Sequence, residues 1–399
     1  MESKKPKRKF IAGAKRIILY GLIFGTVAGS SFAAVNSLLS KCFSNKEPEK
    51  IALSTTIEPE QSSNPVQTEE PKKKEPTKEE KKLEEIQDMY SLIGRQTKKT
   101  NRSLVEIAAS QKVENGSKPL ITDVVSGVIV AKTKKYIMIL TRYNSIKNMQ
   151  EITVTFMDRS MATGSMQNYD SRTNLAIVKV PISEIMENTL KNLLIIDFGE
   201  SQYLEQGDLI YVVGQPDGLI NSMEFGYITR KSSAMNMEDF QVDIYGTSFG
   251  YHADGYGIVC DMEGKCLGVL DSRYQQQENS SFVGNDKLKL ILENLLNQKK
   301  QVYVGIYGRG ITEEYLEQFH YQTGLYVTEV TVGSPAYEAG MQAGDVIREV
   351  NEEKVDNMTH FFEIIQQYEP KEIVNFKVIR GNDKGERELH LNVKLQERK

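Results

Sequence analysis

Histidine is scarce in this 399-residue chain, which contains only four of them. They stand far apart, at His252, His320, His360 and His390, and so lack the close spacings with which histidines bind one metal ion. This scarcity argues against a metal site, and nothing else in the sequence predicts a cofactor. Between residues 100 and 300, His252 is the only imidazole available for acid–base chemistry.

Charge of one sign is not in excess either, because 50 lysines and arginines stand against 54 aspartates and glutamates, for a net charge of −4. Proteins that hold nucleic acid usually carry a basic excess or a basic patch. We therefore expect no nucleic-acid partner. The one informative basic cluster lies within residues 1–16, which include Lys4, Lys5, Lys7, Arg8, Lys9, Lys15 and Arg16.

A run without any charged residue follows this cluster, from residue 17 to residue 40. At about 1.5 Å per residue a helix of this length reaches about 36 Å, enough to cross a hydrocarbon core of about 30 Å. We expect a single transmembrane helix at 17–40 in the cell membrane, with residues 1–16 in the cytoplasm and the C-terminal domains outside it. The alternative is a cleaved signal peptide, because Ser31, Ala33 and Ala34 supply small residues near the end of the run.

Residues 41–76 are rich in proline and polar side chains. Five of the eleven prolines fall between Pro48 and Pro76, among glutamate, lysine, serine, threonine and glutamine. Such a composition cannot bury enough apolar surface to fold, so we expect a disordered tether.

Residues 77–100 show the pattern of an amphipathic helix. Thr77 and Glu80 have the spacing of a capping box, and an apolar stripe follows at helical spacing. We expect the stripe to pack against the next domain of the chain, and self-association is the alternative. The stripe consists of Leu83, Ile86, Tyr90 and Ile93.

Short β-rich runs separated by turn residues fill much of residues 101–298. Their regular spacing predicts an all-β barrel or sandwich pair. Helical spacing returns only at 288–296, which predicts a packing helix that closes this domain. A mixed α/β unit at 299–398 follows. The clearest runs are 124–130, 136–141, 152–156, 175–180 and 209–213.

Several motifs in these two units resemble those of the membrane-anchored HtrA/DegP-type serine proteases. The resemblance covers about residues 83 to 397 and implies a trypsin-like double β-barrel followed by a PDZ domain. It also implies a homotrimer. The motifs are Ser-Gly-Val-Ile-Val at 126–130, Tyr-Ile-Met-Ile-Leu-Thr at 136–141, Asn-Leu-Ala at 174–176, Gly-Gln-Pro at 214–216, Gly-Lys-Cys-Leu-Gly-Val at 264–269 and Gly-Ser-Pro-Ala at 333–336.

The resemblance assigns the catalytic histidine, aspartate and serine to Asn144, Asn174 and Asp254. An amide side chain cannot serve as a base near neutral pH, and a carboxylate at position 254 would repel the oxyanion that forms during peptide attack. We therefore expect a pseudoprotease that is not an enzyme and that works as a peptide-binding scaffold or regulator. The alternative is an active serine endopeptidase in extracytoplasmic protein quality control.

Two other interpretations of this region remain open. Ser248 and His252 could form a local nucleophile and base, although trypsin-like sites draw these groups from different barrels. Asn144, Asn174 and Asp254 could instead form a small polar binding site.

Cys260 and Cys266 flank a short turn on successive predicted strands. Outside the cytoplasm they could form a disulfide across the hairpin, and two buried thiols are the alternative.

In the last unit, Tyr303, Val304, Gly305 and Ile306 resemble the carboxylate-binding loop of a PDZ domain. Such a loop binds a peptide terminus with backbone N–H groups, while a neighbouring helix supplies an apolar wall. Phe361 and Ile365 are the wall candidates, with Phe362 beside them. The expected partners are C-terminal or unfolded peptides of other proteins.

Overall fold

The computed structural model describes residues 78–111, 120–274, 279–311, 323–382 and 385–398. The predicted cytoplasmic tail, transmembrane helix and tether lie outside these ranges. Within them, no helix is long and apolar enough to cross a membrane.

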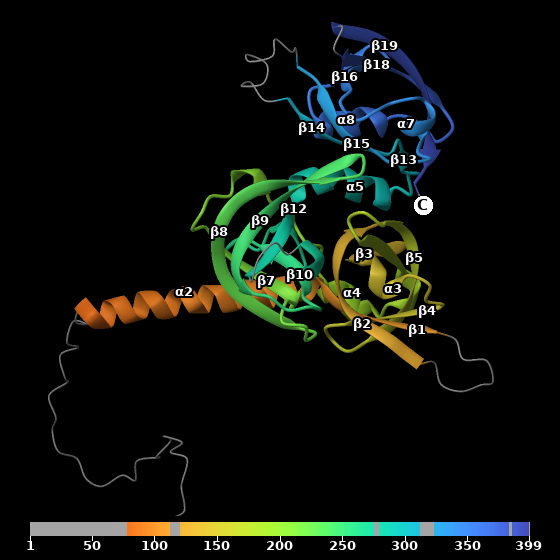
Figure 1. Ribbon diagram of the computed structural model, residues 1–399. Coiled ribbons are helices and arrows are strands. Elements are labelled where there is room, and N and C mark those ends of the chain that lie inside the picture. The colour runs from red at the N-terminus through yellow and green to blue at the C-terminus, as the bar shows by residue number, and fades with distance from the viewer. Residues whose placement is uncertain (1–77, 112–119, 275–278, 312–322, 383–384, 399) are drawn as a thin grey trace, which may run out of the picture. The chain divides into compact units, whose positions relative to one another are not determined.

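Twelve strands between residues 104 and 284 form two closed barrels of six strands each (Figure 1). Closure leaves no strand edge open, and each barrel is filled by side chains from alternating positions. The first barrel runs in the order β1 (Leu104–Gln111), β2 (Leu120–Lys132), β3 (Tyr136–Arg142), β6 (Leu175–Pro181), β5 (Met161–Asp170) and β4 (Glu151–Phe156). The second runs in the order β10 (Tyr256–Cys260), β11 (Cys266–Asp271), β12 (Asn279–Gly284), β9 (Phe240–Gly250), β8 (Ser222–Met237) and β7 (Leu209–Gln215).

Gly127 shows how tightly the first barrel is packed. A Cβ atom at this position would lie 2.7 Å from Ile107 Cδ1 and 2.7 Å from Ile139 Cγ2. Because non-bonded carbon atoms do not approach so closely, a larger residue here would displace the Ile107 and Ile139 side chains.

Short helices connect the strands. Helix α5 (Asn285–Leu296) buries Leu288, Ile291 and Leu295, so the packing helix predicted from the leucine spacing is confirmed. The other connections are η1 (Asn101–Ser103), α3 (Tyr143–Ile146), η2 (Ile182–Glu184), α4 (Glu187–Asn192), η3 (Ser201–Tyr203) and η4 (Ser272–Tyr274).

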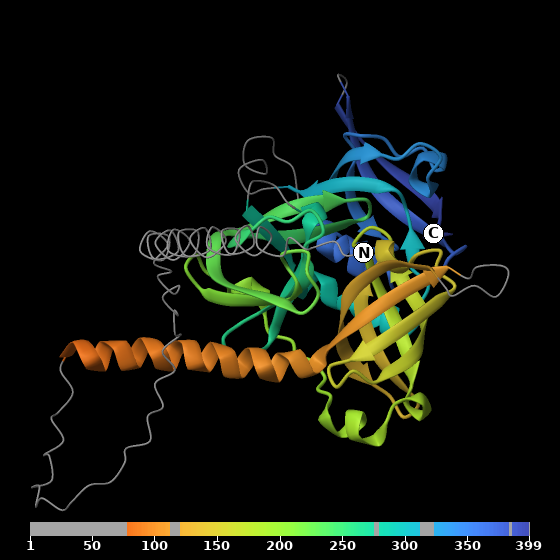
Figure 2. The same ribbon diagram turned by 90° about the horizontal axis from the view of Figure 1, so that it is seen from below.

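Helix α2 (Lys78–Thr100) packs on the barrels only through its C-terminal half. Ile93 is 5% exposed, and the Thr100 hydroxyl lies 2.8 Å from the Tyr211 hydroxyl of the second barrel. Leu83 and Tyr90, in contrast, are 55% and 61% exposed, and Figure 2 shows the helix reaching away from the barrels. The expected packing of the whole apolar stripe on the next domain is therefore wrong except at Ile93.

In its described residues, the C-terminal unit consists of a sheet and two helices. Its strands follow the order β14 (Ile306–Gly310), β15 (Leu325–Val330), β16 (Val346–Val350), β18 (Ile373–Asn382) and β19 (Gly385–Lys394), with β17 (Glu353–Lys354) beside β16. Strand β14 is at one edge. The remaining elements are α7 (Pro335–Glu338), α8 (Met358–Ile365) and the paired strands β13 (Val302–Tyr303) and β20 (Gln396–Glu397).

Candidate functional site

The three sequence-predicted triad positions lie around the contact between the two barrels, and two of them are directly joined. Asn144 lies on α3, immediately after β3, and its backbone N–H donates to Asn174 Oδ1 over 2.8 Å. Asn174 is 2% exposed and has a φ of 58°, a left-handed conformation that asparagine tolerates well. Its Nδ2 donates to Asp271 Oδ2 over 2.9 Å, so a carboxylate from the second barrel is the partner of this amide.

Arg142 occupies the space beside this pair. Its Nη2 donates to the Gly255 carbonyl over 2.6 Å, and its Nε lies 3.6 Å from Asp271 Oδ2. The guanidinium also stands 4.9 Å from the centre of the Tyr256 ring. Burial, followed by the nearby Asp271 carboxylate, raises the pKa of Tyr256, so this phenol stays protonated at neutral pH.

Gln215 is a second link between the barrels at this place. Its Oε1 accepts from the Ser126 N–H over 2.7 Å, and its Nε2 donates to the Asp254 carbonyl over 3.2 Å. Arg142, Gln215 and Asp271 were missed by sequence reasoning. The only signal was a charged or polar residue at the end of an otherwise apolar strand.

Asp254 itself is exposed in a turn, where its N–H donates to His252 Nδ1 over 3.2 Å. The His252 ring lies over Gly218, where a Cβ atom would approach its Cε1 to 2.2 Å. The Ser248 hydroxyl accepts from the Tyr227 N–H over 3.0 Å. In the described hydrogen bonds, Ser248 and His252 thus have different partners, and the structure gives no support to a local pair between them.

Cys260 and Cys266 are opposite each other across the β10–β11 hairpin, as the spacing predicted. Both are buried free thiols in this structure. Burial raises the pKa of Cys266 to about 12, and burial together with Cys266 raises the pKa of Cys260 well above its ordinary value. Neither thiol is a reactive nucleophile in this state.

The predicted carboxylate-binding loop runs from β13 into β14. Gly305 has a φ of 88°, and a Cβ atom there would lie 2.2 Å from Ser334 Cβ, so the turn requires glycine. Three backbone N–H groups of this loop donate to one carboxylate, that of Asp239 at the tip of the β8–β9 hairpin. The distances are 2.9 Å from Val304 to Oδ2, and 2.7 Å from Gly305 and 2.8 Å from Ile306 to Oδ1.

Helix α8 places its apolar residues on two sides. Phe361 and Ile365 belong to the core of the C-terminal unit, and the Phe361 ring lies 6.2 Å from that of Phe376. Phe362 faces the barrels instead, with its ring centre 4.6 Å from that of Phe240. The role of Phe361 and Ile365 in peptide binding stays a prediction, and Phe362 is the helix residue that contacts the hairpin.

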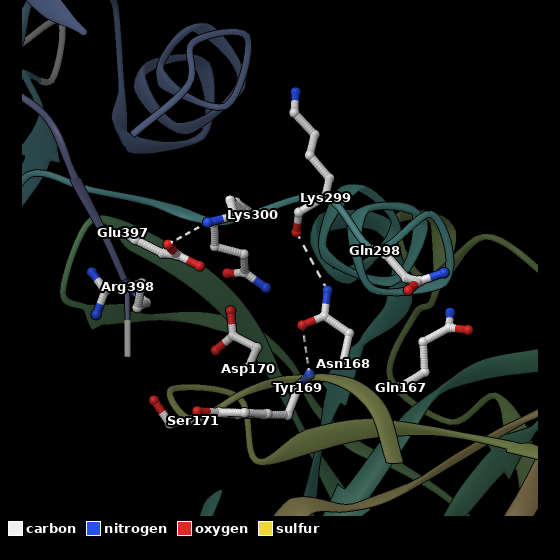
Figure 3. A pocket seen from close by; sticks show the side chains of 11 residues that line it. Gln167, Asn168, Tyr169, Asp170, Ser171, Gln298, Lys299, Lys300, Glu397 and Arg398 are labelled. Atoms are coloured by element: carbon white, nitrogen blue, oxygen red, sulfur yellow. Dashed lines mark hydrogen bonds and ion pairs between the residues drawn. The ribbon is translucent and has the colours of Figure 1, made fainter. Parts of the chain in front are cut away.

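A polar cavity of about 270 Å³ lies between the end of strand β5 and the segments that begin and end the C-terminal unit (Figure 3). It is lined by residues 167–171, 298–301 and 397–398. None of these is an aliphatic apolar residue, and both acidic and basic side chains are among them. Asp170 is buried at its floor and pairs with Arg172 Nη2 over 2.6 Å. Burial alone would raise the pKa of Asp170, but the charge and hydrogen bonds of Arg172 outweigh it and lower that pKa.

The described residues include no group of three or more histidine, cysteine, aspartate or glutamate side chains arranged to hold a metal ion.

Comparison with family models identifies both folded units. Residues 125–269 match the model of a trypsin-like peptidase domain, and residues 326–380 match that of a PDZ domain.

Curated relatives match more than half of the chain. A protein of Synechocystis sp. named putative serine protease HhoB is 26% identical over 260 residues, 61% of each chain. The probable periplasmic serine endoprotease DegP-like of Hahella chejuensis is 24% identical over 65% of this chain and 54% of its own. For the periplasmic serine endoprotease DegP of Escherichia coli the values are 23%, 68% and 56%. The chain thus spans little more than half the length of these relatives.

Solved structures agree on the fold. The HtrA-type protease AlgW with a tripeptide superposes with a TM-score of 0.54 at 16% identity, over 77% of this chain and 97% of that one. The serine endoprotease of Yersinia pestis gives 0.51 at 17% identity, over 77% and 98%. The chain therefore has the domain arrangement of the HtrA/DegP-type trypsin-like serine proteases with a PDZ domain.

These relatives contradict one expectation from the sequence. We expected a chain that is not an enzyme, on the ground of the side chains at Asn144, Asn174 and Asp254, whereas the relatives are named serine proteases or serine endoproteases. The expectation rested on three positions, whereas the family models match residues 125–269 and 326–380.

Proposed function

We propose that this chain is a serine endopeptidase of the HtrA type that acts on polypeptides outside the cytoplasm, in protein quality control. The observation that carries the proposal is the combination of two closed barrels with a PDZ domain, a fold similar to that of solved structures described as an HtrA-type protease and a serine endoprotease. Two of these relatives are named periplasmic, which supports the extracytoplasmic location. The uncharged run at 17–40 with its basic flank supports a membrane anchor, with the N-terminus in the cytoplasm.

The PDZ domain, in this proposal, selects polypeptides by their C-termini. Strand β14 lies at a sheet edge, where an extended peptide can add as a further strand. The loop from Tyr303 to Ile306 directs three N–H groups at one carboxylate position at the start of this strand. Solved relatives of the same fold are described with a tripeptide and with a decapeptide. The homotrimer implied by the family resemblance stays a prediction.

The reacting groups are the part of the proposal that the sequence constrains most. We retain Asn144, Asn174 and Asp254 as the proposed counterparts of the triad. They offer two amides and a carboxylate, whereas the trypsin-like reaction uses a hydroxyl, an imidazole and a carboxylate. The proposed hydrolysis therefore requires a nucleophile other than these three side chains.

The test is hydrolysis of unfolded casein by the purified full-length chain, together with labelling by a serine-directed phosphonate. We expect casein fragments and one phosphonylated residue, identified by mass spectrometry. Replacement of the labelled residue by alanine has to abolish both labelling and turnover, which excludes a contaminating host protease. A chain that neither cleaves casein nor takes up the probe would contradict the proposed activity.

A further inference from the structure

The tip of the β8–β9 hairpin, residues 238–240, lies inside the PDZ domain's carboxylate-binding loop. The Asp239 carboxylate accepts hydrogen bonds from the N–H groups of Val304, Gly305 and Ile306, at 2.7 to 2.9 Å. Asp239 is 1% exposed, so its charge has left water and depends on these donors. The PDZ loop is thus occupied by a side chain of the same protein.

The backbone of Asp239 completes the pattern of a bound peptide terminus. Its N–H donates to the Ile306 carbonyl over 2.7 Å, at the start of edge strand β14. A peptide that adds to a sheet edge with its carboxylate in such a loop makes the same two kinds of contact. Asp239 therefore reproduces, with its side-chain carboxylate, the last residue of a peptide ligand.

Neighbouring residues hold the tip in place. Arg398 Nη2 lies 2.6 Å from Asp239 Oδ2, and Arg398 Nη1 lies 3.0 Å from Glu238 Oε2. The Tyr303 hydroxyl donates to Glu238 Oε1 over 2.9 Å. On the apolar side, Phe240 packs against Phe362 of α8. The tip thus combines an anionic end with an aromatic side chain directed at the helix, as a peptide with an apolar C-terminal residue would.

We propose that residues 238–240 are an internal ligand of the PDZ domain, and that a polypeptide with a free C-terminal carboxylate binds only by displacing Asp239. The inference rests on the peptide-binding part of the proposed function. If the loop is free in a fraction of molecules, the apparent Kd for a peptide rises by the inverse of that fraction. Removing the internal carboxylate then increases affinity without any new contact to the peptide.

The experiment measures binding of a fluorescein-labelled decapeptide with a free C-terminal phenylalanine to the full-length chain, by fluorescence anisotropy. Asp239→Asn keeps the side-chain shape but loses the charge, and we expect it to lower the Kd by about tenfold or more, since charge-assisted hydrogen bonds are lost from the closed form only. Asp243→Asn is the matched control. Asp243 lies on the same strand, where it pairs with Lys287 over 3.0 Å, and its replacement should leave the Kd unchanged. The amidated peptide should bind at least about tenfold more weakly to Asp239→Asn.

Equal affinity of the wild type and Asp239→Asn for the free-acid peptide would overturn the internal ligand and leave peptide binding intact. If neither protein binds the peptide, the peptide-binding proposal fails, and hydrogen exchange decides on the internal ligand by itself. We expect the amides of Val304, Gly305 and Ile306 to exchange at least about tenfold faster in Asp239→Ala than in the wild type or Asp243→Asn, because their acceptor is gone. Unchanged exchange would overturn the proposal.

Discussion

Arg142 joins the two barrels through three contacts. Its guanidinium joins the Gly255 carbonyl, the Asp271 carboxylate and the Tyr256 ring, all from the second barrel, to the end of β3 in the first. Asp271 also holds the Asn174 amide. Sequence reasoning found Asn174 but not its partners, because Asp271 and Gly255 lie 97 and 113 positions from the residues they bind. Patterns of local spacing carry no information on such pairs.

Replacement of Arg142 should destabilise the barrel pair. Arg142→Met keeps much of the packing but removes the nearer of two arginines from the Asp271 carboxylate, whose side chain is 3% exposed, and leaves Arg273 Nε at 3.8 Å. We expect a loss of about 3 kcal/mol in the free energy of unfolding, measured by urea denaturation. Lys191→Met is the control, since its pair with Glu187 is exposed and should change stability by less than about 0.5 kcal/mol. Equal effects of the two variants would show that Arg142 adds nothing beyond a surface ion pair.

The ion pair of Asp170 with Arg172 should make the free energy of unfolding fall at acidic pH. The pKa of Asp170 is lowered in the folded chain, because Arg172 outweighs the effect of burial. The unfolded state therefore binds the proton first, and the stabilisation is present above the unfolded value of about 3.9 and lost as the pH falls below it toward the lower folded value. Urea unfolding between about pH 5 and pH 3 should show a steeper loss for the wild type than for Asp170→Asn. Parallel curves would contradict the assignment.

Secondary-structure elements were the best predicted level. The runs at 136–141, 152–156 and 175–180 fall within β3, β4 and β6, because a short run of β-forming apolar residues bounded by turn residues is a local pattern. Helix α2 was predicted at 77–100 and is observed at Lys78–Thr100. Which of its residues pack on the barrels was not predicted correctly. Apolar residues at helical spacing predict that one face of the helix is apolar. They do not predict which surface, if any, covers that face.

Two alanine substitutions on α2 test which part of the helix packs. Ile93→Ala removes a side chain that is 5% exposed, so we expect a loss of about 2 to 4 kcal/mol in unfolding free energy. Leu83→Ala, ten residues earlier on the same helix, removes one that is 55% exposed and should change stability by less than about 0.5 kcal/mol. A large loss for Leu83→Ala in urea unfolding would mean that the exposed half of α2 is covered in solution.

At the scale of the whole molecule, the PDZ domain contacts the barrels through the ion pairs of Arg398 and the packing of Phe240 on Phe362. The family motifs predicted both domains, but not that Asp239 of one lies in the binding loop of the other, 65 to 67 positions away along the chain. Arg398, near the end of the last described range, balances the two acidic residues of the hairpin tip and stands 4.6 Å from the Tyr303 ring centre. We therefore expect the unfolding of the two domains to be coupled.

Arg398→Met should separate the two domains thermally. The substitution leaves Glu238 and Asp239 without their cation at a contact where the arginine side chain is only 10% exposed. Breaking a buried pair by removing one partner costs about 3 to 5 kcal/mol, so the substitution should weaken the contact that couples the two domains. We expect calorimetry to show one transition for the wild type and two for Arg398→Met, with the PDZ transition moved to the lower temperature. Arg387→Met, an exposed arginine on β19, is the control and should keep the single transition. Two transitions in the wild type, or one in Arg398→Met, would show that the hairpin contact does not couple the domains.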